Sequence, residues 1–528
     1  MEGSTRRARG KTGSRAGGIL LAVISLTGCA SLDVSQDKPA IEGLLAERGA
    51  AGLGWQNNGG DSDAAMADLL AKPMTIDRAV RAAMLKSPQL QQVYGELGLA
   101  RADVLEAIQV ANPRISVSSL ALEGGPGSQL STGVALPLVD LLTLPARSKL
   151  ARTDYERARY EVAASILGVT LDVETAWYRD VAADQVALMR KAVADALATS
   201  ADLAQRFFDA GNITRLQLNR EKAAASQAGI EAARASVAAR LARLEMNTLI
   251  GLSGPQSQWS SDALLPLPLA AEDDPAELQR IAGATSLELL AARKGAAVAA
   301  SAASITRRFR LLGATTIGYD REREVDGSVI RGPALDLELP IFNQGGARVA
   351  RAEARLRIAR ARLARIELSN ANAVALGAER VRVLSDIVGD YRSALVPERE
   401  TVAAQSQLEQ NFALIGEFEV LQARAQQYDA YQGLIEAVRD YWLARTDLTR
   451  LIGSRLPSDA TARSGEVSAA KYLTPPPAPA MDHSAHGGHD HMNMAMPPPP
   501  VSPAPPRPGK APPEVTSPSE HHHPGAGQ

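Results

Sequence analysis

The chain has 528 residues and a formal net charge of −2, with 57 Lys and Arg against 59 Asp and Glu. Hydrophobic residues make up 45% and charged residues 22%, close to globular averages, which excludes a wholly disordered chain. The balanced charge gives no bias toward nucleic acid, and the single cysteine excludes an intrachain disulfide and multi-cysteine metal motifs. With only 4% aromatic residues and abundant Ala and Arg, the composition predicts long helices packed through small side chains.

The N-terminal segment is typical of an exported lipoprotein. A cluster of basic residues precedes a short apolar stretch over residues 17–25, the pattern of a secretory signal peptide. The stretch ends in Leu26-Thr27-Gly28-Cys29, which resembles the bacterial lipoprotein box, where small residues precede the cleaved bond and the thiol accepts the lipid. The sequence therefore predicts removal of residues 1–28 and acylation of Cys29. Ala30 is not the Asp that retains such lipoproteins at the inner membrane, which favours the outer membrane.

The middle of the chain contains one unit twice. Residues 87–90, 135–138, 211 and 249–251 recur, in the same order and at nearly constant spacing, as residues 286–289, 338–341, 416 and 451–453. Four landmarks in one order are unexpected by chance. We expect an acylated tether over 29–74, repeats over 75–252 and 283–455, and a linker over 253–282.

Each copy is predicted to run as helix, strand pair, long helix, glycine turn and second helix. Helices are predicted over residues 75–111, 141–207, 214–250, 283–308, 346–412 and 417–452. Pro88 is expected near a helix start, and Pro397 is expected to kink or interrupt its helix. A continuous helix over 141–207 would be roughly 100 Å long, more than a compact core needs. An elongated helical bundle or spacer has the same periodicity and remains an alternative.

Two strand pairs favour a different architecture. Residues 114–118 and 132–136 flank a glycine-rich turn, and residues 312–319 and 335–339 flank a turn at Asp326-Gly327. Alternating segments of about ten residues fit transmembrane β-strands with lipid on one side and water on the other. Because open sheet edges are not tolerated in lipid, the strands of one chain need neighbouring chains to close a barrel. Three copies would supply twelve strands.

Together these segments resemble the TolC-like outer membrane factor family. Residues 332–346 are similar to the family's strand-to-helix signature, in which a Pro and a Phe precede a glycine pair, and residues 206–214 are similar to its turn between coiled-coil helices. The resemblance covers roughly residues 75–455. It implies a mainly α-helical, internally duplicated subunit. It also implies a homotrimer with a 12-stranded β-barrel in the outer membrane and a long α-helical barrel in the periplasm.

The resemblance implies a function as well. Family members are exit channels of tripartite pumps, whose other parts are a periplasmic adaptor (membrane fusion protein) and an inner-membrane pump of the resistance–nodulation–division type. Residues 412–453 look most like members that accompany copper or other heavy-metal efflux, so the expected cargo is copper, silver or another heavy-metal ion. The expected location is the bacterial outer membrane, with a lipid anchor and with the helices and C-terminal tail in the periplasm.

Family members close the periplasmic mouth with acidic side chains just after the second glycine turn. The matching positions are Glu419 and Gln422, so one acid is retained and the other is replaced by an amide. A ring of three Glu419 carboxylates would repel when ionised and would favour cations. Glu417 is a candidate for a second ring, which no family pattern supports. A solvated carboxylate on a helix surface is the alternative for both acids.

The C-terminal segment, residues 456–528, is predicted to be a disordered tail because the composition changes after about Leu473. Sixteen of the 31 prolines and all seven histidines lie beyond Thr474. Its candidate metal ligands are Met481, His483, His486, His489, His491, Met492, Met494 and Met496. Imidazole suits Cu(II) and thioether sulfur suits Cu(I) or Ag(I), so the mixture predicts loose copper or silver binding. An inert tail of biased composition is the alternative.

No catalytic pattern is apparent in the sequence. The body lacks histidine, which excludes His-based triads and zinc-hydrolase sites there, and no nucleotide-binding fingerprint lies between a strand and a helix. We therefore expect no enzyme activity and no required cofactor. Two other functions remain open: the same channel exporting drugs or secreted proteins, and a non-porous periplasmic lipoprotein with a metal-sequestering tail.

Overall fold

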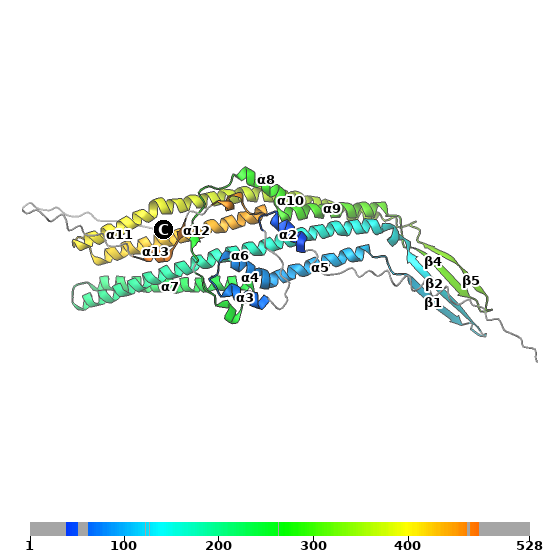
Figure 1. Cartoon of the computed structure of the whole chain (residues 1–528), viewed down its shortest axis with the longest axis horizontal. Helices are drawn as coiled ribbons and strands as arrows, with labels where there is room; N and C mark the ends of the chain where they lie inside the picture. Colours follow the sequence, from blue (N-terminus) through cyan, green and yellow to red (C-terminus); the bar gives the residue numbers. More distant parts are fainter. Residues whose placement is uncertain are drawn as a thin grey trace, which may run out of the picture. The chain divides into compact units, whose positions relative to one another are not determined.

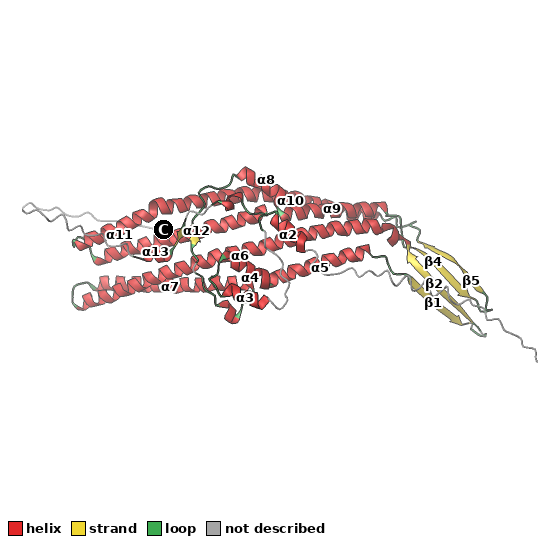
Figure 2. Ribbon diagram, viewed as in Figure 1, coloured by secondary structure: helices red, strands yellow, loops and turns green. Residues whose placement is uncertain are grey.

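The computed structural model describes residues 38–50, 62–121, 123–125, 127–261, 263–461 and 465–474. The chain divides into two units, Met1–Thr474 and Pro475–Gln528, and all described residues lie in the first unit. The predicted signal peptide, Cys29 and the candidate metal ligands of the tail lie outside the described residues. Figure 2 shows that the first unit is mainly helical. Among the described helices, none has both the length and the apolar character needed to cross a membrane.

The first half of this unit follows the predicted order of elements. It comprises α4 (Ile76–Lys86), α5 (Pro88–Ile108), β1 (Arg114–Ala121), β2 (Ser128–Pro137), α6 (Leu138–Asp209) and α7 (Arg215–Ile250). Pro88 lies in the first turn of α5, as predicted. The segment predicted as one helix over 75–111 is instead two helices that meet at Ser87, because the residue before a proline is disfavoured in helical conformation.

The second half repeats that order. It comprises α8 (Pro275–Thr285), α9 (Leu287–Arg308), β4 (Thr315–Arg323), β5 (Val329–Leu337), α10 (Gly346–Asp390), α11 (Val396–Asn411) and α12 (Glu417–Ile452). Ser286 separates α8 from α9 as Ser87 separates α4 from α5, and both serines are buried. A π-helical turn over Tyr391–Leu395 directly precedes the turn that holds Pro397. The predicted interruption is therefore confirmed, because proline lacks the N–H that a continuous helix needs.

Local chemistry fixes the ends of the long helices. Thr214 opens α7 with a capping box, in which its hydroxyl accepts from the Gln217 N–H and the Gln217 side chain accepts from the Thr214 N–H. Gly251 ends α7 with φ +86°, and a Cβ there would lie 2.5 Å from the Lys86 carbonyl oxygen. Gly453 ends α12 with φ +74°, and a Cβ there would lie 2.9 Å from the Ser286 Cα. The same glycine joint therefore occurs in both repeats.

The four long strands form one antiparallel sheet in the order β1-β2-β4-β5. The register pairs Ile115 with Val134 and Val134 with Tyr319, so the two hairpins join within the chain. Figure 1 shows the sheet at one end of the helices of this unit. The outer edges of β1 and β5 have no partner strand in the described part of the chain.

The helices run side by side around α6, which is 72 residues long (Figure 1). α6 packs against α5, α7, α9 and α12. An aromatic cluster lies where α6 meets α12: Tyr178 stacks on Trp442 with ring centroids 5.4 Å apart, and Tyr441 meets Trp442 edge-on at 5.1 Å. This cluster belongs to the main hydrophobic core.

Three segments that we expected to be connectors or tail carry ordered structure. In the predicted tether, α2 (Lys38–Ala46) buries Ile41 and Leu45, and α3 (Ser62–Leu70) follows it. In the predicted linker, β3 (Leu265–Pro266) pairs with β6 (Glu466–Val467). Order also continues through α13 (Ala469–Leu473), beyond the predicted tail boundary at residue 456. These elements are short and pack on the long helices, so their own sequences carry little periodic signal.

Candidate functional site

The sheet has one apolar face and one polar face. Because side chains alternate along a strand, the register places Ile115, Val134 and Tyr319 on the same face, where they are 74%, 47% and 53% exposed. On the opposite face, Gln129 and Ser131 donate hydrogen bonds to the Glu322 carboxylate. The alternation predicted from the sequence is confirmed. Such a two-sided sheet suits strands with lipid on one face and water on the other.

The helices beside the sheet form a row with two open ends. α5 packs on α6, α6 on α9, and α9 on α10, which is the same order as that of the strands they adjoin. α5 and α10 are not among the helix pairs in substantial contact in the described structure. Leu99 on α5 is 69% exposed, and Leu368 on α10 is 66% exposed. Both the sheet and the helical row therefore present unpaired edges.

The candidate gate residues lie in the first turns of α12, after Gly416. Glu417, Glu419 and Gln422 are all exposed, and neither glutamate forms an ion pair with another described residue. Glu419 and Gln422 are three residues apart and share one side of the helix, whereas Glu417 lies on a different side. The structure therefore brings the first two together and separates the third.

A buried ionic cluster near the middle of the helices was missed by the sequence analysis. The Arg445 side chain is 3% exposed, and its guanidinium contacts Glu272 and, at 2.7 Å, Asp459. Burial raises the pKa of the Glu272 carboxyl above its ordinary value, and the Arg445 guanidinium opposes that rise. Arg455 forms a two-pronged ion pair with Glu174, whose side chain is 7% exposed.

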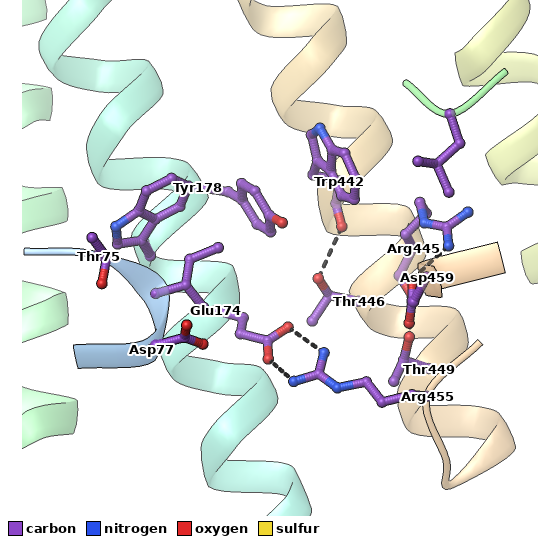
Figure 3. A pocket seen from close by; sticks show the side chains of 13 residues that line it. Thr75, Asp77, Glu174, Tyr178, Trp442, Arg445, Thr446, Thr449, Arg455 and Asp459 are labelled. Atoms are coloured by element: carbon purple, nitrogen blue, oxygen red, sulfur yellow. Dashed lines mark hydrogen bonds and ion pairs between the residues drawn. The ribbon is translucent and has the colours of Figure 1, made fainter. Parts of the chain in front are cut away.

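Figure 3 shows this cluster on the wall of a cavity of about 440 Å³ between α6 and α12. Glu174 and Tyr178 come from α6, whereas Trp442 and Arg445 come from α12. Glu174 and Asp459 at this cavity pair with Arg455 and Arg445, so these pairs hold α6, α12 and the chain after α12 together. A charged residue at the spacing of the apolar residues Tyr441, Leu448 and Ile452 is the one sequence signal that could have revealed Arg445.

No group of three or more His, Cys, Asp or Glu side chains in the described ranges is placed to hold a metal ion. The metal ligands predicted from the sequence, Met481 to Met496, lie beyond Thr474 and outside those ranges. Copper or silver binding by the tail stays a prediction.

Neither a family model nor a curated protein sequence matches the chain. Solved structures do match its fold. One is CusC, whose crystal structures concern the conformational changes that accompany folding and transmembrane channel formation. It matches with a TM-score of 0.59 and 16% identity, over 72% of this chain and 92% of that chain. The outer membrane channel CmeC of Campylobacter jejuni matches with a TM-score of 0.62 and 12% identity, over 72% and 86%. The outer membrane channel MtrE of Neisseria gonorrhoeae matches with a TM-score of 0.58 and 15% identity, over 72% and 89%.

The chain has the fold of outer-membrane channels. The resemblance drawn from residues 75–455 is thereby confirmed at the level of the fold. Within this fold, the two-faced sheet and the open-ended helical row are the surfaces that one chain leaves exposed.

Proposed function

We propose that the chain is one subunit of a homotrimeric outer-membrane channel of a tripartite efflux system. A periplasmic adaptor and an inner-membrane pump of the resistance–nodulation–division type would supply the energy, and the cargo would pass through without covalent change. The observation that carries the proposal is the pair of unpaired edges, on the sheet and on the helical row. Both are completed if β5 and α10 of one copy meet β1 and α5 of the next.

The internal repeat supports this joint between copies. Within one chain, α6 of the first repeat packs on α9 of the second. The equivalent of α6 in the second repeat is α10, and the equivalent of α9 in the first repeat is α5. These two helices are not among the pairs in substantial contact in the described chain. Alignment of Ser286 with Ser87 makes Val298 on α9 equivalent to Leu99 on α5. Val298 is half-buried, whereas Leu99 is exposed, so a neighbouring α10 would cover Leu99 as this row covers Val298.

The opposite side of the joint offers a small side chain, Ala361. Burial aligns Val162 and Thr170 of α6 with Ile366 and Val374 of α10. On this alignment Ala361 is equivalent to Arg157, which lies beside Gly295 of α9. Ala361 is exposed in the single chain, as expected for a position that a second copy covers.

Charge complements this packing. Inside the chain, Glu156 of α6 pairs with Lys294 of α9. At the proposed joint the signs are reversed, because α5 carries the exposed Asp103 and α10 carries the exposed Arg357. Neither of these has an ion-pair partner in the described part of the chain. Ring closure by three copies would join their sheets into one barrel of twelve strands, with the apolar face toward lipid.

A lipid anchor and the periplasmic end of the helices complete the proposed channel. Acylated Cys29 would attach each subunit to the membrane, and Glu419 with Gln422 would line the periplasmic mouth. The turn before α12 exposes Phe412 at 75% and Leu414 at 73%, an apolar tip that suits an adaptor.

The function is tested with the purified full-length protein in detergent. Unheated samples are expected to migrate as trimers that dissociate on boiling, and the trimers are expected to conduct ions in a planar lipid bilayer. A monomer that conducts nothing would contradict the channel and would favour the non-porous periplasmic lipoprotein.

We propose copper or silver ions as the cargo, which the His- and Met-rich composition of residues 481–496 supports. In a strain that lacks the protein, growth is expected to stop at lower copper and silver concentrations than in its parent. A chain that ends at Thr474 should restore only part of this tolerance, and drug susceptibility serves as the control. Unchanged metal tolerance with increased drug susceptibility would replace metal ions by organic cargo.

A further inference from the structure

Three arginines lie on the apolar face of the sheet. The register places Arg321 of β4 directly opposite Arg331 of β5, and Arg323 lies two residues further along β4. Alternation puts all three on the face that carries Tyr319 and Ile317. All three arginines are exposed.

No acid within the described residues neutralises this group. None of the three arginines has an ion-pair partner there. The acids of the same strand, Asp320 and Glu322, project from the opposite face. Like charges placed directly across two strands destabilise the sheet, and Arg321 and Arg331 have no counter-charge in the described chain to offset this repulsion. An anion on this face would supply it.

The position of the group along the strands limits what that anion is. Ile317 and Leu335 pair at the end of the sheet near the helices, whereas the arginines lie toward the turn at Asp326-Gly327. On a lipid-facing surface a guanidinium is costly at the bilayer centre and well tolerated at the level of the headgroups. The part of this face around Ile317 and Leu335 therefore suits the acyl chains of lipid. The part that carries the three arginines suits the lipid phosphates at the membrane surface.

We infer that Arg321, Arg323 and Arg331 bind the phosphate groups of an anionic membrane lipid at the distal rim of the channel. The inference rests on the proposed function, since it places this face of the sheet in lipid. The planar guanidinium binds two phosphate oxygens at once and stays charged at every physiological pH, so paired arginines form a strong phosphate clamp. A closed trimer would carry one clamp on each subunit.

The test uses the full-length trimer in detergent and bisphosphorylated lipid A as the probe, with bound lipid counted by native mass spectrometry. The variant Arg321→Gln/Arg323→Gln/Arg331→Gln is compared with Arg220→Gln/Arg234→Gln/Arg240→Gln, which removes the same charge from exposed positions on α7. The sheet variant is expected to bind lipid A at least tenfold more weakly than wild type, and the α7 variant is expected to match wild type. Dephosphorylated lipid A should bind as weakly to wild type as lipid A binds to the sheet variant.

Inorganic phosphate separates a lipid site from a site for the free ion. At millimolar concentration it should leave lipid A bound, because the acyl chains contribute to the complex, and complete displacement would overturn the lipid assignment. Equal lipid A binding by wild type and the sheet variant, in trimers that still conduct, would overturn the inference and leave the channel intact. A chain that forms no trimer would reject both.

Discussion

At the residue scale, the buried ion pairs fasten segments that are distant in the sequence. Arg455 lies three residues after the end of α12 and pairs with Glu174 in the middle of α6, 281 positions away in the sequence. Arg450, in the last turn of α12, pairs with Asp172 of α6. The two pairs differ in burial, since Glu174 is 7% exposed and Asp172 is 38% exposed. That difference decides how much each arginine contributes to stability.

Arg455→Ala is expected to destabilise the protein much more than Arg450→Ala. Removal of Arg455 leaves the Glu174 carboxylate buried without its partner, at a cost of about 3 kcal/mol. Removal of Arg450 breaks a half-exposed pair, which contributes at most about 1 kcal/mol. The midpoint of thermal unfolding of both variants in detergent measures the difference. Equal midpoints would show that the Glu174 carboxylate is not buried as described.

At the element scale, the long helices could be predicted from the sequence within a few residues. All four strands of the large sheet were located, although β2 begins four residues and β5 six residues before the predicted segments. Their signals are local: alternation marks β4 and β5, a capping box marks the start of α7, and Pro397 marks the end of a continuous helix. The division of the segment over 75–111 was missed, although the equivalent Ser286 junction shows that it is a property of the repeat.

Elements whose stability comes from distant contacts could not be predicted. β3 and β6 have two residues each and exist through pairing across about 200 residues of chain. α2 depends on contacts of Ile41 and Leu45 with the helices that follow it. For the same reason the cluster around Arg445 was missed, since its partners Glu272 and Asp459 lie on different segments. For the candidate gate, helix geometry alone predicts that Glu419 and Gln422 lie on one side of α12.

At the scale of the whole molecule, the proposed channel depends on edges of the sheet and of the helical row that one chain leaves unpaired. The strand order β1-β2-β4-β5 and the helix order α5, α6, α9, α10 end at the same two edges. The repeat already shows, inside one chain, how such edges join. If α10 of one copy packs on α5 of the next as α6 packs on α9 within a chain, both interfaces curve the row of helices in the same direction. Repetition of this curvature closes a ring.

Crosslinking at this joint tests the ring most directly. The variant Leu99→Cys/Ala361→Cys is treated in membranes with a short bis-maleimide, and a chain that carries only the native cysteine is the control. Because α5 and α10 are not among the helix pairs in substantial contact within the described chain, crosslinks should form between copies. We predict covalent dimers and trimers and nothing larger, as in a closed ring of three. Monomers alone, or an open series of higher oligomers, would contradict it.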